Sequence, residues 1–241
     1  MNTKKLVISM MTVAGVFLAT APNAGAATLD SNAIVTFSPD TSITLPVDPM
    51  NPDPENPVTP IDPTNPGGTP NPGTAGPLSL DFASSFDFGD QLISSKDAVY
   101  TAAAQKLSDG SDRPNFVQVS DKRGTEEGWT LRVQQDSQLM SEKTNKELVG
   151  AEITIENGSI VSNSASALPS EVTAKLNLSD LAQKNVVVAS KGEGNGTYVY
   201  RMGDDATKNS SVKLSVPGST SKMSEKYQTT LTWTLSDIPT P

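Results

Sequence analysis

The chain has 241 residues, a formal net charge of −9, and neither cysteine nor histidine. Without cysteine, an exported chain has no disulfides and must bury an adequate apolar core. Without histidine, Ser-His-acid and Cys-His hydrolases are excluded, and the commonest zinc ligand is missing. The acidic balance argues against nucleic acid as a partner, because phosphate binding needs clustered lysine and arginine.

Residues 1–26 have the pattern of a secretory signal peptide. Lys4 and Lys5 precede a mostly apolar run from Leu6 to Ala21, and Ala24-Gly25-Ala26 supplies a small-x-small cleavage site. We expect cleavage after Ala26, with the next residue as an alternative site. Loss of two lysines takes the net charge of the mature chain from −9 to −11. The alternative is that this segment is retained as a membrane helix, which needs about 20 uninterrupted apolar residues. No later stretch of the sequence is apolar over that length.

Two segments separate the signal from the main domain. Residues 27–45 form a short β-prone arm with expected strands at Ala33 to Phe37 and Ser42 to Leu45. Two strands alone are marginal, so the arm docks on the main domain, docks on a partner, or stays disordered. Residues 46–77 contain 11 prolines in 32 residues, which is typical of an extended, polyproline-like tether.

Residues 78–241 alternate short β-forming runs with turn residues, as in a sandwich or barrel. Asn157-Gly158 indicates a two-residue hairpin, and Gly192 to Gly196 indicates another hairpin turn. One short helix is expected around Leu178 to Lys184. The expected strands are Leu78 to Phe82, Gln91 to Ser94, Ala98 to Ala104, Phe116 to Ser120, Trp129 to Gln134, Glu152 to Glu156, Ser159 to Ser162, Val186 to Ser190, Thr197 to Arg201, Val212 to Val216 and Tyr227 to Leu235.

The two tryptophans of the chain occur in the same tripeptide, Trp129-Thr130-Leu131 and Trp233-Thr234-Leu235. Period-2 alternation puts each Trp and Leu on one face of a strand. Thr130, Arg132, Thr232 and Thr234 point to the other face.

These motifs resemble the WxL family of Gram-positive cell-surface proteins. Val117 to Gly124 followed by Gly128-Trp129-Thr130-Leu131 is similar to the proximal half of a WxL domain. Leu231 to Asp237 is similar to the distal half. Phe86-Asp87-Phe88-Gly89, Leu148 to Ile153 and the upstream Pro-rich run also fit. The resemblance covers roughly residues 78 to 241.

The resemblance implies a secreted protein held non-covalently on peptidoglycan at the cell wall of a Gram-positive bacterium. It implies no enzymatic activity. It also implies action beside other WxL-cluster surface proteins and a membrane-anchored companion. Many relatives carry a long adhesive region ahead of the domain, whereas here the domain is expected to be nearly the whole mature protein. The expected fold is all-β: an immunoglobulin-like β-sandwich with long loops, preceded by the Pro-rich linker.

The candidate ligand-binding residues are those of the two motifs: Trp129, Thr130, Leu131, Trp233, Thr234 and Leu235. Their periodicity favours burial of the tryptophans in the core, and the alternative is a platform on which sugar rings stack. Arg123, in the charged turn before Trp129, and Arg132 are candidate polar contacts; a solvated hairpin loop is the alternative for the turn.

No residue pattern indicates a metal, a cofactor or a catalytic pair. Asp109 to Asp112 and Gly203 to Asp205 do not match a calcium-loop spacing, and plain turns account for them. Three functional hypotheses remain: direct peptidoglycan binding, a structural or interaction subunit whose wall association depends on a companion, and adhesion to a host ligand. A neutral or zwitterionic polymer suits the acidic surface better than polyanionic teichoic acid does.

Overall fold

The computed structural model describes residues 26–65, 67 and 69–239. It divides into two units, residues 1–36 and 37–241. In the first unit, described residues 26–36 are exposed and have no regular secondary structure. Apart from Ala26, the expected signal peptide lies outside the described residues.

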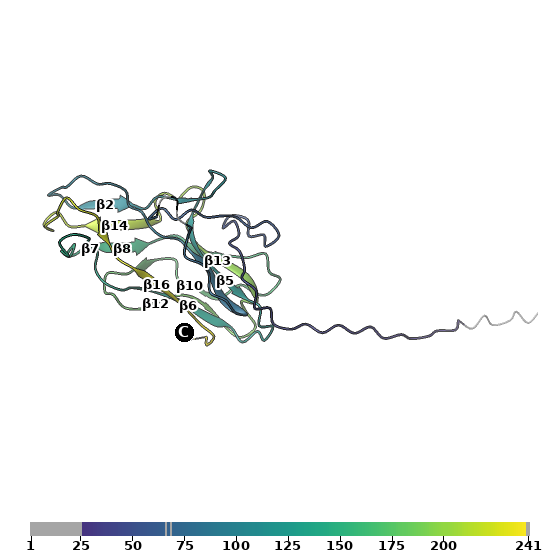
Figure 1. The fold of residues 1–241 in the computed structure, drawn as a ribbon. Helices are drawn as coiled ribbons and strands as arrows, with labels where there is room; N and C mark the ends of the chain where they lie inside the picture. Colours follow the sequence, from purple (N-terminus) through teal and green to yellow (C-terminus); the bar gives the residue numbers. More distant parts are fainter. Residues whose placement is uncertain (1–25, 66, 68, 240–241) are drawn as a thin grey trace, which may run out of the picture. The chain divides into compact units, whose positions relative to one another are not determined.

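The second unit is all-β, with antiparallel pairing throughout its named strands and no helix among its described residues (Figure 1). The expected all-β sandwich-type fold is confirmed, although its main strands form three four-stranded sheets rather than two. In neighbour order, the β5 sheet is β1 (Leu78–Ala83), β5 (Asn115–Asp121), β13 (Gly196–Met202) and β9 (Gly158–Val161).

The other two large sheets have the same size. The β6 sheet is β10 (Glu171–Val172), β12 (Lys184–Ala189), β6 (Trp129–Gln135) and β16 (Leu231–Ser236). The β14 sheet is β11 (Leu176–Asn177), β8 (Glu152–Ile155), β14 (Val212–Val216) and β2 (Ala98–Thr101). Two small ribbons pair β15 (Tyr227–Gln228) with β7 (Met140–Ser141) and β3 (Gln105–Lys106) with β4 (Asp112–Arg113).

One apolar core joins the three large sheets. It takes Val117 and Val119 from β5, Leu131 from β6, and Ile153 and Leu214 from the β14 sheet. These side chains alternate with residues on the opposite strand faces, as period-2 patterning requires. Burial of this core compensates for the absence of disulfides.

The Pro-rich segment differs from the predicted tether, because residues 46–62 pack against the β5 sheet and the β3–β4 ribbon; we call them the strap. Val47 is fully buried and belongs to a second apolar cluster with Phe82, Phe116 and Val199. The Val47 amide donates to Gln118 Oε1 at 2.7 Å, and Gln118 Nε2 donates to the Leu45 carbonyl at 3.0 Å. The strap thus covers the face of β5 that points away from the main core.

Polar contacts fix both ends of the strap. Arg113 donates from Nε and Nη2 to the carboxylate of Asp48, at 2.7 to 2.9 Å. Further along, the Ile61 amide donates to the Lys106 carbonyl at 2.9 Å. Turns interrupt the expected extended backbone, because the Asn51 amide donates to the Asp48 carbonyl and the Asn56 amide to the Asp53 carbonyl, whereas the amides of Val47 and Ile61 donate to the domain. The prediction of a free tether is therefore wrong over these residues.

Several local predictions were also wrong. Neither Ala33 to Phe37 nor Ser42 to Leu45 forms a strand, and Gln91 to Ser94 is an exposed loop. The expected helix around Leu178 is a turn, in which Leu181 has a left-handed φ of 57°. The remaining strands were located within a few residues, although Tyr227 to Leu235 divides into β15 and β16.

The two expected hairpin turns connect strands that do not pair with each other. Asn157, with φ of 55°, and Gly158 carry the chain from β8 in the β14 sheet to β9 in the β5 sheet. Gly192 to Gly196 similarly lead from β12 to β13. The residues adopt turn geometry as expected, but the strands that follow find partners elsewhere.

Candidate functional site

The two tryptophan motifs lie on neighbouring strands. β6 and β16 pair antiparallel, with Leu131 opposite Leu235 and Val133 opposite Trp233. Directly opposed residues share one face of a sheet, so both tryptophans and both leucines point to the same side. The C-terminal strand thus brings the distal motif beside the proximal one.

Trp129 fills the main core. Its side chain is fully buried, and its indole Nε1 donates to the Gly194 carbonyl at 2.9 Å. The ring of Tyr198 meets it edge-on, with centroids 6.1 Å apart. Gly194 has a φ of 76°, and a Cβ there would lie 2.5 Å from the indole nitrogen. The Gly-rich loop before β13 therefore closes over the ring.

The first motif is consequently buried in this structure. Trp129 and Thr130 are 0% exposed and Leu131 is 1% exposed. Thr130 is on the face opposite the core, but its hydroxyl donates to the Ile238 carbonyl at 3.0 Å. Burial in the core, the alternative that periodicity favoured, describes Trp129 and Leu131, and ligand contact by these three residues stays a prediction.

The second motif is more accessible because β16 is an edge strand of its sheet. Trp233 and Leu235 are partly buried and pack against the main core. Thr234 is partly exposed on the opposite side of the strand. Of the two motifs, the distal one therefore retains surface that a polymer can reach.

The side of the β6–β16 pair that faces away from the core carries a ladder of polar side chains. Thr232 pairs in register with Gln134, and Thr234 pairs with Arg132. We call these four residues the outer face. Arg132 Nε donates to Asn185 Oδ1 on β12 at 2.9 Å, which holds the guanidinium along the sheet.

The outer face offers hydroxyl, amide and guanidinium groups in fixed positions. Gln134 Nε2 donates to the Leu181 carbonyl at 2.9 Å, and the Thr232 hydroxyl donates to Asp136 Oδ2 at 3.0 Å. The outward direction of Thr232, Thr234 and Arg132 was predicted from the sequence, whereas Gln134 was not singled out. Strict alternation along the strand was the signal for all four.

Arg123, the predicted polar contact, forms its hydrogen bonds within its own loop. Its Nε and Nη2 donate to the two oxygens of Asp121 at 2.9 and 2.7 Å, and Nη2 also donates to the Gly128 carbonyl. This hydrogen-bonded carboxylate raises the pKa of Arg123. The Arg123–Asp121 pair orders the turn that leads into β6, so Arg123 helps to position this strand.

A model of the family described as WxL domain surface cell wall-binding matches residues 24–239. The chain belongs to the WxL family. Comparisons with curated proteins and with solved structures gave no match. The WxL match includes the arm and the Pro-rich segment, in agreement with the packing of the strap on the domain.

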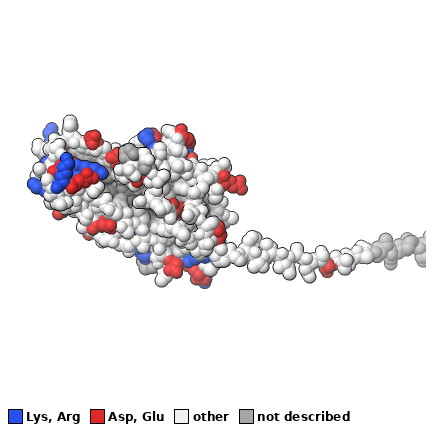
Figure 2. Space-filling model, in the orientation of Figure 1, with Lys and Arg blue, Asp and Glu red and all other residues white. Residues whose placement is uncertain are grey.

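Membership places this WxL protein at the cell surface, with the wall as its binding partner. Within the residues that the structure describes, no helix is long and apolar enough to cross a membrane, and no group of acidic side chains could hold a metal ion. In Figure 2, opposite charges gather near one end of the visible face, and much of the surface in the region of β6, β12 and β16 is uncharged.

Proposed function

We propose that this WxL domain binds peptidoglycan directly through the outer face of the β6–β16 pair. The observation that carries the proposal is the polar ladder of Arg132, Gln134, Thr232 and Thr234 on the strands that hold both signature motifs. The buried Trp129 serves as the scaffold beneath this face, and Trp233 closes the core at its edge.

The chemistry of the ladder suits a neutral, hydroxyl-rich and amide-rich polymer. Side-chain hydroxyls and amides both donate and accept hydrogen bonds, and the guanidinium donates several in a fixed plane. Sugar hydroxyls, acetamido groups and peptide units are complementary to such a row. A polymer repeats these contacts along its length, so weak individual hydrogen bonds add up through multivalent attachment.

The charge of the chain favours the same polymer over polyanionic teichoic acid. The net charge of −11 on the mature chain, which is −9 less the two lysines of the signal, creates a field that repels polyphosphate chains. Hydrogen bonding at the outer face is screened by salt much less than a contact driven by net charge. We therefore expect binding that persists at physiological and higher ionic strength.

The experiment is a pull-down of the purified mature chain by purified Gram-positive sacculi, with and without teichoic acids, at low and high salt. The proposal predicts binding to bare sacculi that changes little with salt. Loss of binding at moderate salt, or a requirement for teichoic acids, would contradict it. Because both components are purified, the assay also separates direct binding from attachment through a companion protein.

The remaining parts of the proposal concern export and chemistry. Residues 1–26 act as a cleaved signal peptide, so the mature protein is secreted and retained on the Gram-positive wall. It performs no catalysis and carries no cofactor. Mass spectrometry of the mature protein tests the first point: an N-terminus other than Ala27 or Thr28 would contradict the cleavage site.

A second candidate function is that of an interaction subunit in a surface complex, with a role in host adhesion. The observation that favours it is the apolar arm, in which Ile34, Val35 and Phe37 are 93%, 74% and 88% exposed. A β-forming segment of this kind can add a strand to a neighbouring protein.

Removal of residues 27–39 tests the arm without disturbing the strap, because Asp40 is the residue whose carboxylate bonds to Lys122 on the domain. The truncated chain should still bind bare sacculi but lose co-purification of its surface partner. Unchanged co-purification would refute the role of the arm.

A further inference from the structure

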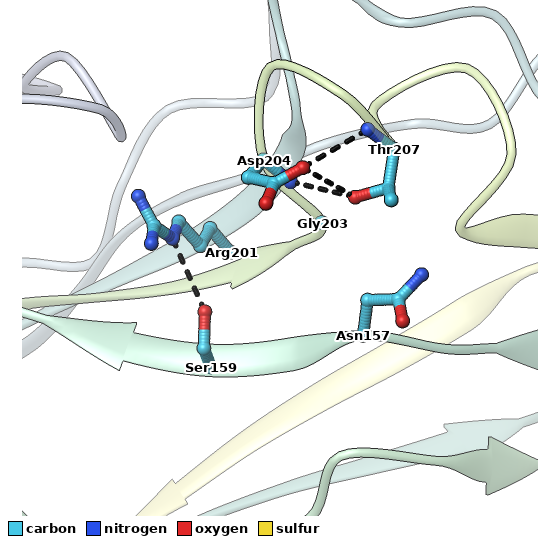
Figure 3. Close-up of a pocket in the computed structure, with 6 residues that line it drawn as sticks. All are labelled: Asn157, Ser159, Arg201, Gly203, Asp204 and Thr207. Atoms are coloured by element: carbon cyan, nitrogen blue, oxygen red, sulfur yellow. Dashed lines mark hydrogen bonds between the residues drawn. The ribbon is translucent and has the colours of Figure 1, made fainter.

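A polar hollow of about 250 Å³ lies at the β9 edge of the β5 sheet (Figure 3). β9 and β13 supply its floor, and the loop between β13 and β14 supplies its wall. The residues that line it are Asn157, Ser159, Arg201, Gly203, Asp204 and Thr207.

The walls of the hollow are held in place by their own hydrogen bonds. Arg201 and Ser159 are register partners, and Arg201 Nε donates to Ser159 Oγ at 3.1 Å. Asp204 Oδ1 accepts from the hydroxyl of Thr207 at 2.8 Å and from the amides of Ala206 and Thr207 at 3.0 Å. The site is thus ordered before any molecule enters it, which reduces the entropic cost of binding.

Two opposite charges meet this hollow without pairing. In the part of the chain that the structure describes, Arg201 and Asp204 form no ion pair with each other or with another residue, and Figure 3 shows no hydrogen bond between them. Hydrogen bonds from Thr207 lower the pKa of Asp204, so its carboxylate is ionised at neutral pH. The guanidinium is also charged, and its Nη1 has one weak contact, with Met50 Sδ at 3.5 Å.

This arrangement selects against simple ions. A lone anion attracted by Arg201 is repelled by Asp204, and a lone cation experiences the reverse. A molecule that carries both charges a few bonds apart satisfies the two groups together. Charge-assisted hydrogen bonds of this kind are stronger than neutral ones and give orientation as well as affinity.

We propose that the hollow binds a zwitterionic amino-acid or peptide end, with its carboxylate on Arg201 and its ammonium group on Asp204. In the context of wall attachment, which rests on the proposed function, the peptide units of peptidoglycan that are not cross-linked carry free carboxylate and ammonium groups. The outer face then contacts the polymer along its length, and the hollow binds its peptide ends.

The test is a titration of the mature full chain with the dipeptide alanyl-alanine in both enantiomeric forms, followed by NMR. The N-acetylated and C-amidated dipeptides serve as blocked probes. Binding should weaken about tenfold or more when either end is blocked, because one charged hydrogen-bonded contact is lost. Equal binding of the free and blocked dipeptides, or no binding by the folded wild type, would overturn the proposal.

Matched variants locate the site. Arg201→Gln and Asp204→Asn should each weaken dipeptide binding about tenfold or more. Asn keeps an oxygen for the donors around Oδ1, so the loop retains its hydrogen bonds. The control is Asp205→Asn, the same change of charge at an exposed neighbour outside the hollow, and it should bind as the wild type does. An equal loss in the control would refute the assignment.

Sacculus binding by the same samples separates this proposal from the general one. If the dipeptide does not bind but bare sacculi do, the zwitterion site is refuted and peptidoglycan binding through the outer face stands. If the dipeptide binds but bare sacculi do not, the hollow is confirmed and wall binding through the outer face is refuted.

Discussion

Replacement of Trp129 distinguishes a core residue from a contact residue. The side chain is fully buried, and its Nε1 donates to the Gly194 carbonyl at 2.9 Å. Truncation of a buried Trp to Ala costs about 3 to 5 kcal/mol in unfolding free energy. The indole hydrogen bond accounts for about 1 kcal/mol, and more if the Gly194 carbonyl is left buried and unsatisfied. Trp129→Ala should therefore lose about 3 to 5 kcal/mol or more.

Trp233→Ala is the matched comparison, because Trp233 is partly exposed at the edge of the same core. Its ring is only partly removed from water, so truncation should cost less, about 1 to 2 kcal/mol. Trp129→Phe keeps an aromatic ring but removes the donor to Gly194, and should cost about 1 to 3 kcal/mol.

Urea unfolding followed by far-UV circular dichroism measures these differences without relying on tryptophan fluorescence. The slope of free energy against urea should stay constant, so that shifts of the midpoint report stability. If folded Trp129→Ala lost less than about 1 kcal/mol while its wall binding disappeared, the ring would be a contact residue, and the assignment to the core would be refuted.

Three further predictions concern the strap, the loop over the indole and an ion-pair cluster. Val47→Ala should lower the free energy of unfolding by about 2 kcal/mol, because Val47 is fully buried. Ile43→Ala, at a side chain that is 62% exposed, should change it by less than about 0.5 kcal/mol. Equally small effects of both substitutions in urea unfolding would show that the segment is a free tether. Gly194→Ala should destabilise the fold more than Gly192→Ala, because both have positive φ but only the former Cβ meets the indole; equal melting temperatures would contradict this. Two lysines lower the pKa of Glu156 from 4.5 to about 2, so its stabilising contribution is present above pH 4.5 and is lost as the pH falls toward 2. Glu156→Gln should remove that part of the acid sensitivity, and an unchanged pH profile of stability would refute it.

Local patterning was sufficient to locate most of the strands. Trp129 to Gln134 and Val212 to Val216 alternate apolar and polar residues, and each forms a strand with its apolar side in the core. The same alternation gave the directions of the motif side chains. It could not distinguish the fully buried Trp129 from the partly exposed Trp233. A strand lies at the edge or in the interior of a sheet according to its long-range pairing, which the local pattern does not contain.

The strap could not be predicted from composition. The prolines and acidic residues of 46–62 are typical of a solvated linker. Every residue of β5 is nevertheless buried, and the strap covers the strand face that carries Gln118. Backbone groups around Leu45 and Val47 bond to that amide, which is a contact across more than 70 positions of the sequence. Backbone carbonyl and amide groups occur in every sequence. The amino-acid composition therefore does not predict which tertiary partners they bond to.

The turns illustrate the same limit. Asn157-Gly158 has the conformational freedom of a hairpin turn, and Asn157 does adopt positive φ. A turn sets the local change of direction, but the sheet that the next strand joins is decided by burial of its apolar face. Here β8 and β9 enter different sheets, and this crossing forms part of the polar hollow at Asn157.

The most direct test of the outer face is the affinity of purified sacculi for the Thr232→Val, Thr234→Val double variant. Valine keeps the β-branched shape of threonine and removes only the hydroxyl. The control is Thr101→Val, at an exposed position on β2 in another sheet. Binding should weaken about tenfold or more in the folded double variant and stay unchanged in the control. Wild-type binding by the folded double variant would contradict the outer face as the wall-binding surface.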